Sequence, residues 1–152
     1  MSTQSFETQS IPRPQRSQRF LRAYGENYPL SEFTEKIIKC SIEVHSNLGP
    51  GLLEKLYEEA LIHEFELQNI SFERQKIIKF FYKNKEIGNH KLDCVVEDKV
   101  ILELKAVDEL NKIHKAQLLT YLRAMNKPVG LLINFNHERL KDGLKRIVNT
   151  VV

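Results

Sequence analysis

Hydrophobic and polar positions alternate most clearly between Leu92 and Lys105. Two apolar runs flank the polar break Glu97-Asp98-Lys99, which predicts a strand, a tight turn and a second strand. Side chains alternate between faces along a strand. One face of the second strand is therefore wholly apolar and should belong to the core: Val100, Leu102, Leu104 and Ala106. The opposite face carries an acid and a base: Ile101, Glu103, Lys105 and Val107.

The rest of the hydrophobic pattern predicts the order helix, helix, three strands, helix, strand, helix. Apolar residues recur every three to four positions in 31–48 and 52–65, with Ser31 as the expected N-cap and Gly49-Pro50-Gly51 as the break between two helices. Strands are expected over 72–82, 86–96, 100–107 and 129–134, and further helices over 114–125 and 140–148.

Composition places the chain among ordinary globular proteins. Its 152 residues are 41% hydrophobic and 28% charged, which suits one domain with a sizeable core. No apolar run approaches the ~18 residues of a membrane span, and the N-terminus lacks the apolar segment of a secretory signal. Cys40 and Cys94 show no zinc-ligand spacing, so we expect a reducing, cytoplasmic setting. The net charge of +3 does not by itself indicate a nucleic-acid partner.

The first 30 residues differ from the rest, because they are rich in Ser, Gln, Thr, Pro and Arg and poor in aliphatic residues. Four arginines recur there at intervals of three: Arg13, Arg16, Arg19 and Arg22. We expect a flexible basic tail over 1–30 and a folded domain over 31–152. The tail could bind phosphates, serve as an organelle-targeting peptide, or have no role beyond solvation.

Asp93, Glu103 and Lys105 form the main candidate site. The predicted hairpin brings Asp93 beside Glu103, and buried charges are costly unless they are paired or hold a metal. Two carboxylates can hold Mg²⁺ or Mn²⁺ together with a substrate phosphate, and Lys105 could orient the attacking water or stabilise the transition state. The alternative is a cross-strand ion pair on a solvated sheet face.

Three further side chains are candidates because of their positions on helices. Gln117 and Tyr121 are four residues apart and share a helical face, where they could contact a phosphate and a base, or merely pack locally. Glu54 borders an apolar stripe and is either a third carboxylate or an exposed glutamate. His90, His114 and His137 show no ligand spacing and are expected to be structural or exposed. Phosphate-binding loops and nucleophile elbows are absent from the sequence.

These motifs together resemble a known family. The run from Gly51 to Tyr57, with Glu54 between them, resembles the signature of the bacterial GxxExxY proteins, which are assigned to the PD-(D/E)XK nuclease superfamily. Asp93 and the run Glu103-Leu104-Lys105 resemble the defining acid and acid-x-lysine elements of that superfamily. Gln117-Leu-Leu-Thr-Tyr121 resembles the QxxxY element of its RecB-like branch, and 127–135 is also typical. The superfamily's proline is replaced by Leu92.

The resemblance implies an α/β (α+β) fold with a restriction-endonuclease-like core, in which helices flank a mixed sheet. It implies a magnesium-dependent nuclease acting on DNA, in nucleic-acid processing or repair, and a homodimer is conceivable. Asp93, Glu103 and the accessory Glu54 would bind the metal, and Lys105 would be catalytic. From its position on the helix, we expect Gln117 to serve both catalysis and substrate binding, and Tyr121 to contact the substrate. The alternative is a catalytically inactive module that keeps the fold and binds nucleic acid or protein.

Overall fold

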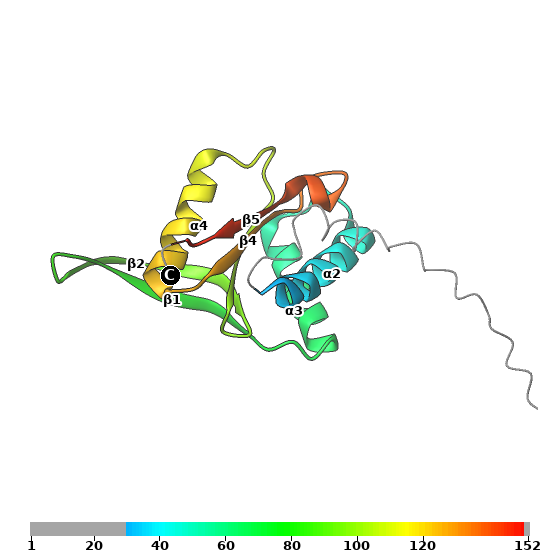
Figure 1. Cartoon of the computed structure of the whole chain (residues 1–152). Coiled ribbons are helices and arrows are strands. Elements are labelled where there is room, and N and C mark those ends of the chain that lie inside the picture. The colour runs from blue at the N-terminus through cyan, green and yellow to red at the C-terminus, as the bar shows by residue number, and fades with distance from the viewer. Residues whose placement is uncertain (1–29, 151–152) are drawn as a thin grey trace, which may run out of the picture.

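A mixed sheet of five strands forms the centre of the protein, with the strand order β1-β2-β3-β4-β5 (Figure 1). The computed structural model describes residues 30–150. The expected basic tail therefore lies outside the described residues, apart from Leu30. The elements in chain order are α2 (Ser31–Leu48), α3 (Glu54–Leu67), β1 (Phe72–Tyr82), β2 (Lys85–Val96), β3 (Val100–Lys105), α4 (Lys112–Met125), β4 (Val129–Asn134), the short 3₁₀ helix η1 (Leu140–Gly143) and β5 (Leu144–Val148).

The sheet combines antiparallel and parallel pairing. β1, β2 and β3 are paired antiparallel, β3 and β4 parallel, and β4 and β5 antiparallel. Parallel strands need a crossover, and α4 supplies it between β3 and β4. Glu103 and Lys105 thus lie at the edge where both parallel strands end.

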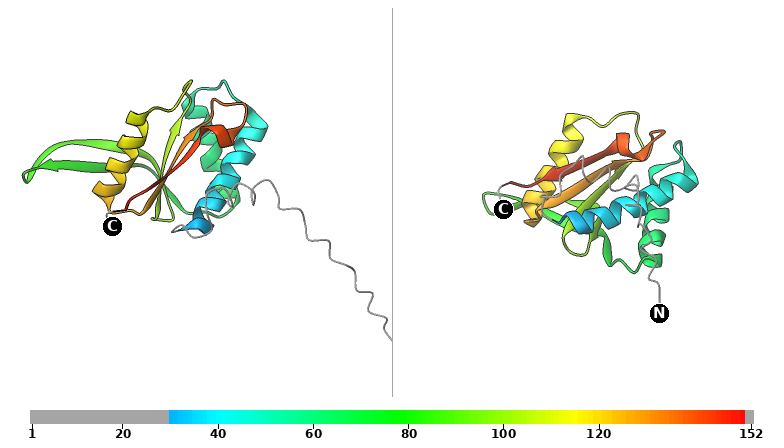
Figure 2. Two further views of the ribbon diagram at one scale, coloured as in Figure 1. Left: turned by 45° about the horizontal axis from the view of Figure 1, so that its top comes forward. Right: turned by 45° about the vertical axis from the view of Figure 1, so that its right-hand side comes forward.

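Helices cover both faces of the sheet (Figure 2). α2 and α3 lie against one face, where Tyr57, Phe65, Leu102 and Phe135 belong to the larger hydrophobic cluster. α4 covers the other face and forms a second cluster that includes Leu118 and Leu122. The apolar face predicted for β3 is confirmed, since Val100, Leu102 and Leu104 are buried in the larger cluster with Ala106 packed against it. Within residues 30–150, no helix has the length and apolar character needed to cross a membrane.

The last element corrects the sequence-based prediction of a helix over 140–148. Residues 140–143 form one 3₁₀ turn, and 144–148 form β5 at the sheet edge. β4 is buried along its whole length, so its backbone groups need partners on both sides. β3 supplies one set and β5 the other. Consistent with a strand, Leu144 packs in the larger cluster and Ile147 against the smaller one.

The start of α2 also differs from the prediction. Ser31 is the first helical residue and not the N-cap; the N-cap is Leu30, which has a left-handed φ of 61° and makes no side-chain cap. The hydroxyl of Thr34 instead donates to the carbonyl of Ser31 at 3.0 Å. α3 begins at Glu54, two residues later than expected.

The two faces of the β1–β2 pair exchange sides near the start of β1 and the end of β2. Leu92 and Cys94 are two residues apart, yet Leu92 packs in the α4 cluster and Cys94 in the α2–α3 cluster. On β1, Arg74 pairs with Cys94 and Lys76 with Leu92, and Gln75 between them has a left-handed φ of 52°. The reversal therefore falls at Asp93 and Gln75.

Candidate active site

Asp93 and Glu103 meet where β2 separates from β3. The β2–β3 pairing runs from Val96 only as far as Cys94. Beyond it, the carboxylate of Asp93 accepts a hydrogen bond from the backbone N–H of Leu104 at 2.8 Å, in place of a backbone carbonyl. The Asp93 N–H in turn points to Oε1 of Glu103 at 3.4 Å. The fork between the strands thus holds both acids together.

The two carboxyl groups share a buried environment that disfavours their charged forms. Glu103 is only 5% exposed. Burial, reinforced by the negative charge of Asp93, raises the pKa of Glu103 to about 8. Burial also raises the pKa of Asp93; the Leu104 N–H opposes this effect and the charge of Glu58 adds to it. A buried acid pair of this kind holds a proton near neutral pH, or requires a cation to ionise fully.

Lys105 follows Glu103 on β3, on the same face of the strand. Its positive charge offsets part of the rise in the pKa values of Asp93 and Glu103. The Lys105 ammonium therefore acts electrostatically on both acids. Its carbonyl accepts from the N–H of Phe135 at 2.9 Å. Next to it, the fully buried side chain of Asn134 binds Val107 through both its amide nitrogen and its oxygen, at 2.8 and 3.0 Å. These contacts fix the backbone that carries Lys105.

Glu54 lies at the first position of α3. Burial and the charge of Asp93 raise the pKa of its carboxyl group, and Lys105 lowers it. The exposed Glu54 is therefore near the acid pair but is not part of its hydrogen bonding among the described residues.

The glycines and the tyrosine around Glu54 build the loop that precedes α3. The buried Tyr57 hydroxyl donates to the carbonyl of Gly49 at 2.6 Å and accepts from the N–H of Leu52 at 3.1 Å. Gly49 and Gly51 have φ values of 67° and 99°, which glycine adopts without strain. The ring of Tyr57 stacks on Phe135 at 4.6 Å. The Gly and Tyr positions therefore fix the start of α3 and, with it, Glu54.

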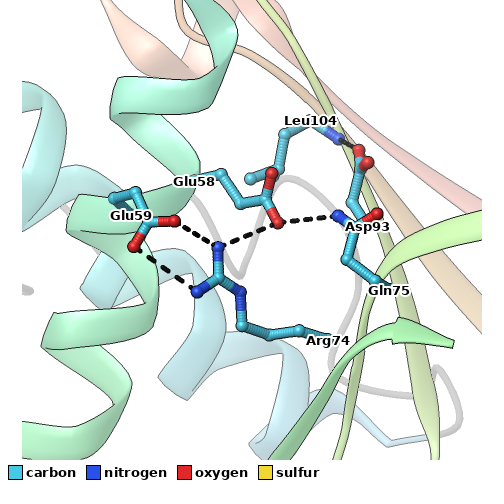
Figure 3. A network of polar contacts seen from close by, with 6 residues as sticks. All are labelled: Glu58, Glu59, Arg74, Gln75, Asp93 and Leu104. Atoms are coloured by element: carbon cyan, nitrogen blue, oxygen red, sulfur yellow. Dashed lines mark hydrogen bonds and ion pairs between the residues drawn. The ribbon is translucent and has the colours of Figure 1, made fainter.

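Glu58 is a second acid on α3 whose proximity to the site was not predicted from the sequence (Figure 3). Its carboxylate accepts from Arg74 at 3.3 Å and from the amide of Gln75 at 2.9 Å. Arg74 also binds Glu59 at 2.6 Å. The network holds α3 against β1 where the strands turn over, beside Asp93. The i, i+4 spacing of Glu54 and Glu58 was the available signal.

His90 is the other residue that the sequence did not single out. Its ring stacks on Tyr121 of α4 at 4.4 Å, and Nε2 lies 3.9 Å from Oε1 of Glu103. This nitrogen is buried and has no hydrogen-bond partner among residues 30–150. A regular strand would place His90 on the same face as Cys94, so only the reversal at Asp93 brings it to Glu103. No sequence signal could have revealed this.

The remaining predicted residues lie on α4 or away from the site. The ring of Tyr121 stacks on His90, which lies 3.9 Å from Glu103. Burial and then the charge of Glu103 raise the pKa of the Tyr121 hydroxyl. Gln117 is exposed one helical turn earlier, and no hydrogen bond ties it to the acids. His114 completes a capping box with Asn111 at the start of α4, and the His137 carbonyl binds His45.

Comparison with known proteins identifies the family of the chain. Residues 31–147 match the sequence profile of the PD-(D/E)XK nuclease superfamily. The chain belongs to the PD-(D/E)XK nuclease superfamily. The observed mixed sheet and helices are consistent with the restriction-endonuclease-like fold of that superfamily. Among curated proteins, none matches the sequence significantly.

PD-(D/E)XK nucleases generally use divalent metals, and the site has the chemistry for one. Carboxylate oxygens are the ligands that Mg²⁺ and Mn²⁺ prefer, and Asp93 and Glu103 converge as a buried pair that a cation would neutralise. Over residues 30–150, no three His, Cys, Asp or Glu side chains form a complete ligand cluster. Mg²⁺ is commonly held by one or two carboxylates plus substrate phosphates, so the pair fits this ion.

Proposed function

We propose that this protein is a magnesium- or manganese-dependent nuclease of the GxxExxY group that hydrolyses phosphodiester bonds of DNA in nucleic-acid processing or repair. The observation that supports this most directly is the buried Asp93–Glu103 pair in the fork of β2 and β3. Such a pair, with Lys105 beside it, costs stability in a protein that only needs to fold. A role in binding a cation explains why both acids lie there.

In this proposal each residue has a definite task. Asp93 and Glu103 hold the metal, with Glu54 as the accessory acid on α3. When bound, the divalent ion would polarise the phosphate and favour ionisation of the attacking water. The ammonium of Lys105 orients that water and stabilises negative charge on the phosphate as the bond breaks. Gln117 and Tyr121 contact the substrate from α4.

His90 acts on Glu103 and not on the substrate. Its orphaned Nε2 faces the Glu103 carboxylate at 3.9 Å, while Tyr121 supports its ring. A donor in this position would favour the ionised form of Glu103, the form that binds a cation.

Metal binding and cleavage measured on the same preparations test the proposal. We expect calorimetry to show binding of Mn²⁺ or Mg²⁺, and a supercoiled plasmid to be nicked only when the metal is present. Asp93→Asn and Glu103→Gln should weaken metal binding and abolish nicking. Wild-type protein that binds neither metal nor DNA would refute the proposal. Protein that binds DNA without metal or cleavage would instead support the inactive nucleic-acid-binding module.

We further propose a compartment, an oligomeric state and a domain boundary for this protein. Cys40 and Cys94 are buried free thiols, and burial raises the pKa of both. This suits a reducing compartment such as the cytoplasm. A homodimer is part of the proposal, and light scattering on the full-length chain tests it. We also propose that residues 31–152 form the nuclease domain.

A further inference from the structure

The β1–β2 hairpin extends well beyond the body of the protein as a two-stranded arm (Figure 1, Figure 2). We define the arm as residues 76–91. Its strands pair from Lys76–Leu92 to Tyr82–Lys85, and the turn uses Lys83 and Asn84 with φ values of 45° and 66°. Positive φ at both central residues is the tight hairpin geometry that suits the twist of the strands. The arm is thus a two-stranded β-ribbon whose register shifts once, between Phe80 and Phe81.

The outer part of the arm packs on nothing within the described chain. Phe80, two residues before the end of β1, lies 6.2 Å from the ring of Tyr121, so α4 covers one face of the arm as far as this residue. Beyond that point every residue from Phe81 to Asn89 is exposed. Three large apolar side chains gather near the tip: Phe81 and Tyr82 are each 62% exposed and Ile87 is 63% exposed. An exposed apolar group of this size marks an interaction site.

The charge of the arm indicates the chemistry of the partner. Five lysines lie in residues 76–91, against the single acid Glu86: Lys76, Lys79, Lys83, Lys85 and Lys91. The whole chain carries a net charge of only +3, so residues 76–91 alone have a larger net positive charge than the complete chain. Lysines interleaved with aromatic residues match a nucleic-acid backbone with bases beside it.

We propose that the arm docks on duplex DNA, with its lysines on phosphates and Phe81 and Tyr82 against base edges in a groove. This inference rests on the proposed nuclease function. The major groove of B-DNA admits a two-stranded β-ribbon, and the arm is exposed on both faces toward its tip. A protein partner would need an acidic surface matched to these lysines, whereas every DNA duplex offers one.

The arm is continuous with the active site. β2 runs from Lys85 at the tip through His90 to Asp93. At ~3.4 Å per residue this stretch spans roughly 27 Å, which is the rise of about eight base pairs. A duplex lying along the arm would therefore be contacted over about eight base pairs, from the phosphodiester bond to be cleaved near Asp93 to the tip of the arm.

Salt-dependent DNA affinity tests the inference. In a cleavage-silent Asp93→Asn background, binding of a fluorescent 24-base-pair duplex is measured by anisotropy between 50 and 300 mM salt. The slope of log affinity against log salt is negative. Lys83→Gln with Lys85→Gln should make it shallower by about 2, because each lost phosphate contact contributes ~0.9 to its magnitude. The corresponding loss of affinity at 0.1 M salt is roughly 10- to 100-fold. Phe81→Ser with Tyr82→Ser should weaken binding without changing the slope.

Matched controls separate the arm from net charge and from folding. Lys39→Gln with Lys141→Gln removes the same charge at exposed positions on α2 and η1, and should bind nearly as the parent does. In the wild-type background, metal-dependent hydrolysis of a phosphodiester too small to reach from Asp93 to the tip of the arm should be unchanged by Lys83→Gln with Lys85→Gln.

The outcomes distinguish this inference from the proposed function. Equal losses from the arm and control variants would overturn the inference and leave the nuclease proposal standing. So would a loss confined to single-stranded DNA, or a change in oligomeric state with unchanged duplex affinity. Wild-type protein that neither binds nor cleaves DNA would overturn both.

Discussion

The carboxylate of Asp93 accepts the backbone N–H of Leu104 at 2.8 Å, in the gap where the β2–β3 ladder ends. The Asp93 carboxylate thus replaces the backbone carbonyl that would otherwise accept from Leu104, and Asp93 lies beside Glu103. Asp93 has a structural task and a proposed catalytic one, and the two can be separated by substitution.

Asp93→Asn and Asp93→Ala should differ in stability. The asparagine oxygen can still accept from Leu104, whereas alanine leaves the N–H of this buried residue without its acceptor, at a cost of about 1–3 kcal/mol. Urea denaturation of both variants measures the difference. Neither should cleave DNA, because both lose the negative charge. Equal stability of the two variants would show that the hydrogen bond contributes little.

Lys105→Met should separate metal binding from turnover. The substitution keeps the apolar stem and deletes the ammonium. Metal binding by Asp93 and Glu103 should persist or tighten, because a nearby positive charge is gone. Cleavage should fall by at least ~100-fold. Calorimetry and plasmid nicking measure the two effects, and Lys141→Met on the exposed face of η1 is the matched control. Loss of metal binding with Lys105→Met would contradict the assigned role.

Stability without metal should depend on pH through Glu103. Its pKa is raised from 4.5 to about 8 in the folded protein, so the folded state holds the proton more tightly than the unfolded chain. This contribution is fully present below the unfolded pKa and is lost as the pH rises toward 8. In EDTA, we expect the Tm of wild-type protein to fall over that range relative to Glu103→Gln. Parallel pH profiles for the two proteins would contradict the assignment.

Added Mg²⁺ should reverse this trend. Because the cation binds the ionised carboxylates and displaces the proton, the increase in Tm on adding Mg²⁺ should grow as the pH rises from 5 to 8. Glu103→Gln should remove most of that growth. Thermal melts with and without metal at matched ionic strength provide the measurement.

Tyr57→Phe should destabilise the protein by about 1–3 kcal/mol. Tyr57 is fully buried, and its hydroxyl bridges Gly49 and Leu52; its removal leaves the Leu52 N–H without a partner. Tyr82→Phe is the control, because that hydroxyl is on an exposed ring at the arm tip. Denaturant titration compares them. Equal effects would mean that the tyrosine of the signature has no part in holding the loop.

Gly143→Ala tests the conformation of the last segment. In the structure, a Cβ at Gly143 would overlap the carbonyl oxygen of Asn134, whereas one at Gly88 meets nothing within 4 Å. We therefore expect Gly143→Ala to cost at least 1–3 kcal/mol and Gly88→Ala to be nearly neutral. If 140–148 were a helix, the alanine would stabilise it by up to ~1 kcal/mol.

Local pattern was sufficient to predict most of the fold. Apolar residues recur every three to four positions in α2 and α3 and at every second position in β3. Each spacing results from burial of one side of the element and can be recognised directly in the sequence. The hairpin register likewise predicted that Asp93 and Glu103 lie together, because only a short polar turn separates their strands. The apolar face of β3 followed from the same alternation.

Tertiary structure decided what local spacing leaves ambiguous. Leu140, Leu144, Ile147 and Val148 fit a helix as well as a strand, and the open edge of β4 decided in favour of a strand in 144–148. The position of His90 depends on the exchange of faces of the β1–β2 pair at Gln75 and Asp93. The periodicity of the sequence does not predict this exchange. Glu58 lies near Asp93 because α3 packs across the same fork. The sequence determined which side chains could form the site, and the sheet and its two helical layers determined which of them meet, because such contacts join segments that are distant along the chain.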